Sequence, residues 1–304
     1  MPADPLFELP DGRRLGYAER GVPGGVPLLF FHGTPGARIV LPSHDPVARE
    51  LGVRIVAPDR PGYGLSSPCA DRTLRSWAHD VRALADHLGL ERFAVAGASG
   101  GGPYALACAA ALPERVTVAA LVCTAAPFPG ARHLRALSVW NRLKFGVPRW
   151  APWLLRADLA LLAPLIRARP ALVARLAARS VGRGAGASDR GDPGAGDPTD
   201  ADRIAQLTRL LAEAFRRGST GLYSDLVLAG RDWDVDPTTI TTPVHLWHGE
   251  ADDVAPVSMA RDLAAAIPRC TVHIVAGAGH QILHRPDVWR GVLRAVVAAR
   301  PASR

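Results

Sequence analysis

The sequence has few of the features that mark disulfide-stabilised, metal-binding or membrane-spanning proteins. Its four cysteines do not show metal-ligand spacing, and a chain of 304 residues can bury a core without disulfide bonds. We therefore expect reduced thiols and no metal bound by cysteine. No apolar run reaches the roughly 18 residues that suggest a membrane span. Residues 1–10 lack the apolar segment of a signal peptide, so we expect a cytoplasmic protein.

Lysine is almost absent, because Lys144 is the only lysine among 36 basic residues. The net charge of +8 would suggest a nucleic acid, a membrane or an acidic substrate, but a GC-rich codon bias explains abundant arginine equally well. The charge is also unevenly distributed. Residues 131–180 hold nine Arg and Lys144 against the single acid Asp158, a net charge of +9, which leaves −1 elsewhere. We therefore expect no nucleic acid partner, and the basic stretch leaves open a small-molecule substrate that is apolar or anionic.

Short apolar runs bounded by Gly, Pro or Asp predict buried parallel strands, which are covered on both faces. These runs span residues 26–31, 53–57, 93–96, 117–123, 244–247 and 271–275. Helical periodicity appears between them at 74–88, 103–112, 258–266 and 287–299. Residues 6–20 predict a hairpin around Asp11-Gly12. This alternation is typical of an α/β fold, a mostly parallel sheet flanked by helices.

The alternation stops between residues 127 and 234, where Arg-rich amphipathic segments carry Trp140, Trp150 and Trp153. We interpret 127–234 as a helical cap over the carboxyl ends of the strands, with a mobile loop near 181–202. Residues 1–126 and 235–304 would form the core. We expect the apolar residues of the cap to pack on the core and its arginines to be solvated. Alternatively, the basic cap guides an anionic or amphiphilic ester, or touches an anionic surface.

A Gly-x-Ser-x-Gly motif at residues 97–101 lies between a predicted strand and a predicted helix. This context fits a nucleophile elbow, a sharp turn that exposes a serine and requires small neighbours. Ser99 is the candidate nucleophile, and the N–H of Gly100 is a candidate oxyanion donor. The tight turn after residue 31 would supply the second donor. Pro35 has no N–H group, so Thr34 is the candidate there.

Two histidines follow the last predicted strand, and His280 is the candidate base because a Gly-rich loop presents it at the sheet edge. His284 is the alternative candidate for the base. An orienting carboxylate should lie between serine and histidine in the chain. No acid occurs from residue 115 to 157, so the segment after the 244–247 run is favoured. Asp252 is our choice there, with Asp253 and Glu250 as alternatives. His32 is expected to brace the loop at residues 32–36.

Together these segments resemble the α/β-hydrolase superfamily over residues 28–125 and 235–300. The resemblance is carried by His32-Gly33, Asp59-Arg60-Pro61-Gly62-Tyr63-Gly64-Leu65-Ser66, the 97–101 motif, Gly249 to Pro256 and Gly279-His280. It implies an α/β-hydrolase fold with an inserted helical cap and no metal or organic cofactor. It also implies a triad of Ser99, His280 and Asp252, with the oxyanion held by Thr34 and Gly100.

The branch of the superfamily is indicated by the residues around the nucleophile. Ser99 argues against haloalkane dehalogenases and epoxide hydrolases, which use Asp there. The His-Gly-x-Pro-Gly turn is similar to that of proline iminopeptidases, but Gly100 replaces their usual tryptophan, which argues against peptidase activity. We expect a serine hydrolase that cleaves an ester or similar acyl bond. A C–C hydrolase or non-hydrolytic enzyme of specialised metabolism, and a slow-turnover small-molecule binding module, are alternatives.

Overall fold

The computed structural model describes residues 4–39, 45–124, 126, 146, 148–184 and 200–300. Trp140 and most of the loop predicted near 181–202 lie outside these residues. Within them, the chain forms an eight-stranded sheet with the order β1-β2-β4-β3-β5-β6-β7-β8. The strands are β1 (Leu6–Glu8), β2 (Arg14–Gly21), β3 (Val26–Phe31), β4 (Val53–Pro58), β5 (Phe93–Ala98), β6 (Val116–Val122), β7 (Val244–Gly249) and β8 (Cys270–Val275).

The strand pairing follows the pattern expected from the sequence. β1 and β2 form the antiparallel hairpin, and β2 pairs antiparallel with β4. The six strands from β3 to β8 are parallel to one another. Their carboxyl ends therefore meet at one edge, where the loops after β3, β4, β5, β7 and β8 converge. The predicted α/β fold is confirmed.

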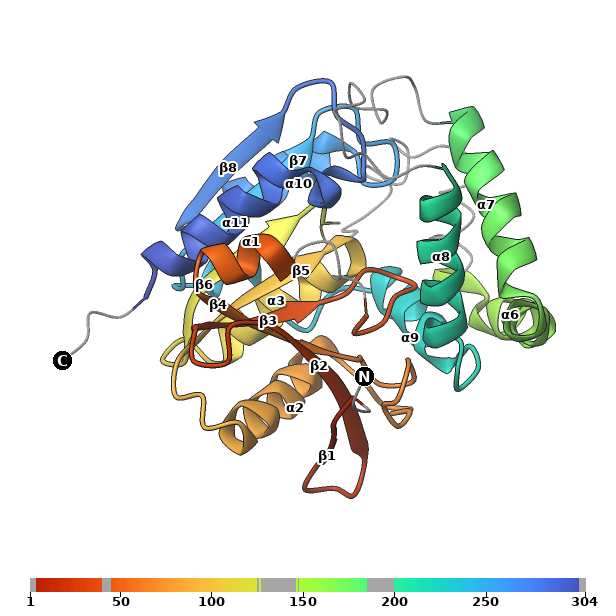
Figure 1. The fold of residues 1–304 in the computed structure, drawn as a ribbon, viewed down its shortest axis with the longest axis horizontal. Helices are drawn as coiled ribbons and strands as arrows, with labels where there is room; N and C mark the ends of the chain where they lie inside the picture. Colours follow the sequence, from red (N-terminus) through yellow and green to blue (C-terminus); the bar gives the residue numbers. More distant parts are fainter. Residues whose placement is uncertain are drawn as a thin grey trace.

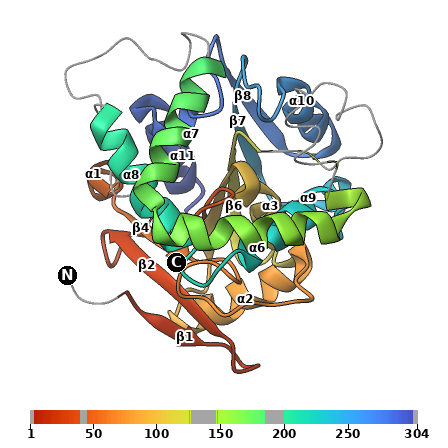
Figure 2. The same cartoon turned by 90° about the vertical axis from the view of Figure 1, so that its right-hand side faces the viewer.

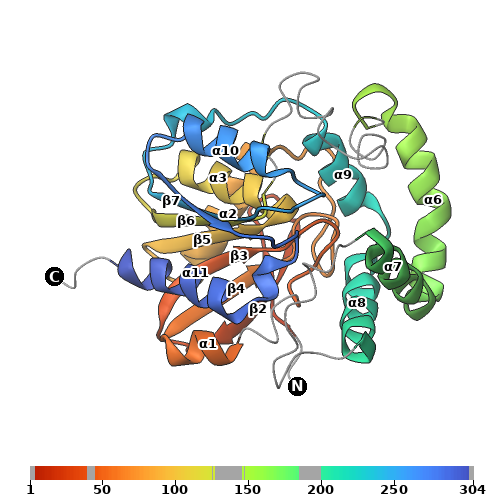
Figure 3. The same ribbon diagram turned by 90° about the horizontal axis from the view of Figure 1, so that it is seen from above.

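Helices cover both faces of the sheet (Figure 3). One face is covered by α2 (Leu74–His87), α3 (Gly102–Ala111) and α10 (Val257–Ala266). The other face is covered by α1 (Asp45–Glu50) and α11 (Pro286–Ala298). α1 was not predicted from the sequence, because six residues are too few to display helical periodicity.

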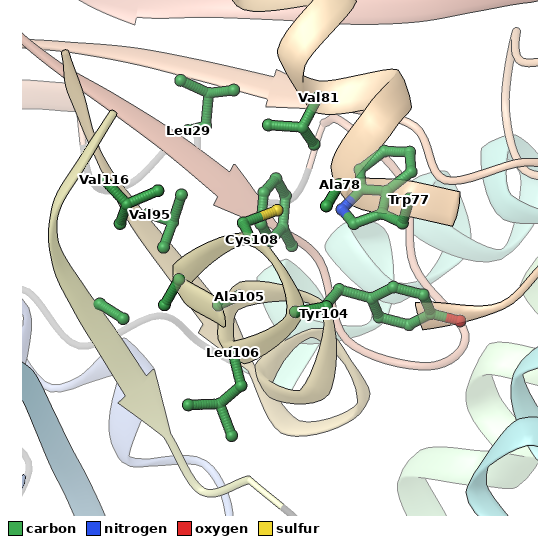
Figure 4. Packing of buried hydrophobic residues seen from close by; sticks show 14 of the residues in the cluster. Leu29, Trp77, Ala78, Val81, Val95, Tyr104, Ala105, Leu106, Cys108 and Val116 are labelled. Carbon is green, nitrogen blue, oxygen red and sulfur yellow. The ribbon is translucent and has the colours of Figure 1, made fainter. Parts of the chain in front are cut away.

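Alternating side chains of the strands divide the core into two layers. In β3, Leu29 and Phe31 pack on the α2 and α3 side, whereas Leu28 and Phe30 pack on the α11 side. Figure 4 shows the first layer, in which Trp77 of α2 lies among buried residues of β3, β5 and α3. The Trp77 ring meets Phe31 edge-on at 5.4 Å between ring centroids.

Between β6 and β7, the described residues form four further helices that stand beyond the carboxyl ends of the strands (Figures 1 and 3). They are α6 (Pro152–Ala168), α7 (Pro170–Gly184), α8 (Asp200–Ala214) and α9 (Thr220–Ala229). Their inward sides share a small apolar cluster with Tyr63 of the core. None of the described helices is both long and apolar enough to cross a membrane.

The expectation that the apolar side chains of this region pack inward is wrong for most of α6. Leu159 and Ala163 are buried, but Leu154, Leu161 and Leu165 are exposed. The inward positions of α6 and α7 include the small residues Ala163 and Ala174. Leu159, Ile166 and Val173 also lie on the inward sides, so the buried sides hold both large and small residues, and the apolar residues on the other sides of α6 remain in solvent.

Replacing Trp77 with alanine should strongly destabilise the fold, because its side chain is fully buried. Truncating a buried Trp costs about 3–5 kcal/mol through lost burial and a residual cavity. The matched control is Trp153→Ala, since Trp153 is 67% exposed and its truncation should change stability by less than about 0.5 kcal/mol. Urea unfolding followed by circular dichroism measures both, and equal midpoints for the two variants would contradict the packing described here.

Candidate active site

Ser99 lies at the sharp turn between β5 and α3, in a short 3-10 turn, η2 (Ser99–Gly101). Its φ angle is 50°, in the left-handed region that side-chain-bearing residues rarely adopt. The flanking glycines make this turn possible. A Cβ atom on Gly97 would overlap the carbonyl oxygen of Gly101, and one on Gly101 would overlap that of Phe31. Ser99 is only half-buried.

The predicted serine, histidine and carboxylate meet in one hydrogen-bonded chain. The Nε2 atom of His280 lies 2.9 Å from Ser99 Oγ, and its Nδ1 atom lies 2.7 Å from Asp252 Oδ2. An ionised carboxylate only accepts hydrogen bonds, so Nδ1 carries the proton and Nε2 is left to accept from the serine hydroxyl. This is the tautomer that a general base acting on Ser99 requires.

Asp252 is buried and has several hydrogen-bond donors. Besides His280, it accepts hydrogen bonds from the backbone N–H groups of Val254 and Ala255 at 2.9 and 2.8 Å. Burial alone would raise the pKa of Asp252, but these hydrogen bonds and the nearby histidines outweigh it and lower the pKa. The carboxylate therefore stays charged and fixed beside the His280 ring.

The other acids and histidines considered from sequence lie elsewhere. Glu250 accepts a hydrogen bond from the N–H of Gly277 at 3.0 Å and so holds the turn before His280. Asp253 is exposed, and His284 ends the short turn η5 (Ile282–His284). Of the candidate pairs, Asp252 and His280 are the ones that the structure brings together with Ser99.

The predicted oxyanion donors lie next to each other. A Cβ atom built on Gly100 would be 3.5 Å from the backbone nitrogen of Thr34. His32 braces this loop as expected, because its Nε2 accepts the N–H of Arg60 at 3.2 Å and its Nδ1 lies 2.8 Å from the Gly33 carbonyl oxygen. Burial and the Arg60 charge hold the pKa of His32 well below its usual range, so the ring is neutral and acts as a brace.

Sequence reasoning did not identify Asp225 of α9, a buried carboxylate at the centre of a polar cluster beside Thr34. Its two oxygens accept hydrogen bonds from Thr34 Oγ1 at 2.6 Å, Arg60 Nη2 at 2.6 Å, Arg72 Nη2 at 2.5 Å, Tyr63 Oη at 2.8 Å and Tyr104 Oη at 2.8 Å. We call these six residues the Asp225 cluster. The available signal was that Asp225 is the only charged residue in the apolar segment 220–229.

The charges of the Asp225 cluster do not cancel, since two buried arginines face one carboxylate. Burial would raise the pKa of Asp225, but the guanidinium groups of Arg60 and Arg72 hold it well below its usual range. Arg60 also donates to the carbonyl oxygens of His32 and Gly33. The cluster therefore fixes the backbone that carries Thr34 and leaves a net positive charge close to the predicted oxyanion position.

A second buried ion pair supports the loop after β4. Asp59 is fully buried and accepts hydrogen bonds from Arg38 Nη1 at 2.9 Å and from the N–H of Leu65 at 2.9 Å. Arg38 also contacts Glu213 of α8 at 2.5 Å. Both buried arginine sites thus join a core loop to a helix of the 200–229 region.

One group of described side chains has the composition of a metal site. Cys123, His248 and Asp252 place one ligand atom each within 4.8 Å of one another. However, Asp252 is already hydrogen-bonded to His280. Burial raises the pKa of the Cys123 thiol, which keeps the sulfur protonated and so unsuited to bind a metal. His248 donates from Nε2 to the Ala255 carbonyl oxygen at 2.7 Å. This arrangement favours a brace for Asp252 over a metal centre.

Comparison with known families agrees with this architecture. The sequence model of the alpha/beta hydrolase fold family matches residues 26–285, from β3 to the turn after β8. The chain belongs to the α/β-hydrolase family. The resemblance inferred from the sequence motifs is thereby confirmed.

Individual relatives of this α/β hydrolase match over shorter stretches. A dihydrolipoyllysine-residue acetyltransferase component of the acetoin cleaving system from Pseudomonas putida is 37% identical over 116 residues, 38% of this chain and 31% of that protein. A proline iminopeptidase from Neisseria gonorrhoeae is 38% identical over 107 residues, 33% of each protein. The matches thus span about a third of the length of these relatives.

Among solved structures, this α/β hydrolase resembles a thermophilic esterase from Thermogutta terrifontis with malate bound. The TM-score is 0.65 at 20% identity, and the likeness covers 97% of this chain and 98% of the esterase. At this identity the likeness concerns the fold alone.

Replacing Asp225 with asparagine should lower the free energy of unfolding by about 3–5 kcal/mol, because Arg60 and Arg72 would lose their buried counter-charge. Asp232→Asn is the control, since Asp232 is exposed. The pKa of Asp225 is lower in the folded state, so its contribution is complete above about pH 3.9 and is lost only as the pH falls further. Urea unfolding at neutral pH measures the difference, and an unchanged midpoint for Asp225→Asn would refute the prediction.

Proposed function

We propose that this α/β hydrolase is a serine hydrolase that cleaves an ester or similar acyl bond of a small organic molecule. The observation that carries the proposal is the hydrogen-bonded chain from Ser99 through His280 to Asp252. The proline iminopeptidase among its sequence relatives supports acyl chemistry. Gly100 in place of a tryptophan favours an ester over a peptide substrate.

In the proposed first step, Ser99 Oγ attacks the carbonyl carbon of the substrate while His280 Nε2 takes the hydroxyl proton. The negative charge that develops on the carbonyl oxygen is held by the N–H groups of Thr34 and Gly100. The imidazolium then gives its proton to the leaving alcohol, and the acyl group stays on Ser99 as an ester. Asp252 keeps the ring oriented and stabilises its positive charge.

In the second step, water attacks the acyl-enzyme. His280 Nε2 takes a proton from the water as the oxygen bonds to the acyl carbon, and the same two N–H groups hold the new oxyanion. Collapse of the intermediate breaks the bond to Ser99 Oγ, which regains its proton from His280. The carboxylic acid product leaves, and the starting hydrogen bonds are restored.

We also propose that residues 127–234 serve as a cap that shapes substrate entry. The described helices α6–α9 stand beyond the strand ends that carry the triad (Figure 3). α9 supplies Asp225, which bonds to Thr34, and α8 supplies Glu213, which bonds to Arg38. These contacts support a cap that is anchored to the oxyanion loop and does not hang freely over the site.

Replacing Ser99 with alanine should reduce hydrolysis of p-nitrophenyl esters by about 10⁶-fold, because the nucleophile is lost. It should also abolish covalent labelling by a fluorophosphonate probe. Ser258→Ala is the matched control, since Ser258 is an exposed serine of α10. Persistent labelling at another serine would refute the assignment. A folded wild type that binds esters without hydrolysing them would indicate the binding-module alternative.

Asp252→Asn should lower kcat by about 10³–10⁴-fold with little change in KM, because the amide no longer stabilises the correct His280 tautomer. Asp253→Asn tests the neighbouring acid and should leave kcat near the wild-type value. Steady-state kinetics on one p-nitrophenyl ester compares the two variants. A greater loss in Asp253→Asn would move the orienting role to that residue.

A further inference from the structure

The outer side of α6 is exposed and apolar, the reverse of an ordinary surface helix. The described residues expose eleven large apolar side chains, and eight of them lie between residues 150 and 176. These eight are Trp150, Trp153, Leu154, Leu161, Leu162, Leu165, Leu172 and Leu176. A concentration of this kind marks an interaction surface, because monomeric proteins rarely leave a large contiguous apolar patch in water.

The geometry of α6 places most of its exposed apolar residues along one stripe, with Leu162 outside it. A helix turns by about 100° per residue, so positions three, four and seven apart share a side. Leu159 and Ala163 mark the buried side. Eight positions around the opposite side are exposed and apolar, and the charged Asp158 lies at the edge of the same arc. The eight apolar positions are Trp153, Leu154, Ala157, Ala160, Leu161, Pro164, Leu165 and Ala168, which we call the outer face of α6.

Positive charge borders the outer face of α6. Arg156 and Arg167 lie on one flank of the helix, and Arg169 lies on the other, with the single acid Asp158. Arg175 is exposed on α7 beside Leu172 and Leu176. At the start of the stripe, the guanidinium of Arg149 lies 5.8 Å from the centroid of the Trp150 ring. The described residues from 148 to 177 thus carry five arginines and one acid.

We propose that the outer face of α6, with Leu172 and Leu176 of α7, binds the surface of a lipid assembly that carries anionic headgroups. Helices that lie in a membrane interface combine an apolar face, flanking arginines and tryptophans in this way. The apolar stripe enters the boundary between headgroups and acyl chains, and the flanking arginines contact phosphate groups. A second copy of the chain fits less well, because pairing two outer faces would bring arginines against arginines.

The location of α6 permits this contact. Figure 2 shows α6 crossing the front of the molecule, with α7 rising beside it. α6 is about 25 Å long at 1.5 Å per residue, enough for a continuous contact with a lipid surface. The same side of the molecule faces away from the sheet (Figure 3), so docking would leave the core untouched. The inference does not depend on the proposed function, since lipid binding is measured without catalysis.

The test is co-sedimentation of the full chain with vesicles of phosphatidylcholine, with and without phosphatidylglycerol. Wild type and Ser99→Ala should bind the anionic vesicles equally, bind the neutral vesicles weakly, and lose binding as salt screens the arginines. Leu161→Asp should weaken binding by at least about tenfold, because it places a charge in the apolar stripe. Arg167→Gln should weaken it by about fivefold.

Two matched controls separate this face from general surface effects. Leu6→Asp adds the same charge at an exposed leucine of β1, and Arg82→Gln removes an exposed arginine of α2. Both controls should bind like the wild type, and thermal unfolding should show that every variant is folded.

Three results would overturn the proposal. One is equal binding by Leu161→Asp and Leu6→Asp, and another is no binding of wild type to anionic vesicles. The third is a wild-type dimer that Leu161→Asp converts to a monomer in sedimentation equilibrium, since the outer face would then pair two copies.

Discussion

The close passage of backbone around Ser99 is the constraint on which the candidate site depends. A positive φ angle costs a residue such as serine about 1–2 kcal/mol, so the turn persists only because its surroundings hold it. β5 and α3 are both buried and fix the two sides of the turn. Gly97 and Gly101 leave room for the chain to cross itself and to lie against the end of β3. That crossing puts Ser99, Gly100 and Thr34 in one place, and the remaining parts of the site are arranged around it.

Much of this could be predicted from sequence because the decisive signals are local. Strands such as β3 and β5 are covered on both faces and therefore appear as continuous apolar runs between turn residues. The 97–101 motif indicates a nucleophile elbow only because a strand precedes it and a helix follows it. Asp252 and His280 follow neighbouring parallel strands, whose carboxyl ends necessarily meet at the same edge. The division at residues 127 and 234 stays a prediction, since part of that stretch lies outside the described residues.

Other features depend on contacts that no local pattern reveals. Arg72 and Asp225 are 153 residues apart in the chain, and nothing in their immediate sequence pairs them. In α6, periodicity shows an apolar side but not whether that side faces inward. The structure buries Ala163 in the apolar cluster that α6 shares with α7 and α8, and it leaves Leu161 in solvent. The pairing of Arg72 with Asp225 and the choice of the buried side of α6 both depend on how these helices pack in the folded chain, which local sequence patterns do not show.

The Asp225 cluster has a consequence for engineering this scaffold. Helical segments inserted after β6 look like interchangeable modules, and exchanging them is an obvious route to new specificity. Here α9 supplies Asp225, the one carboxylate among the described residues that pairs with both Arg60 and Arg72, and both arginines precede β5 in the chain. A chimaera with a foreign segment would leave two buried cations without a counter-charge unless it brings an acid to the same place. Successful exchange therefore requires that α9 be kept, that the new segment place an acid at the position of Asp225, or that both arginines be replaced.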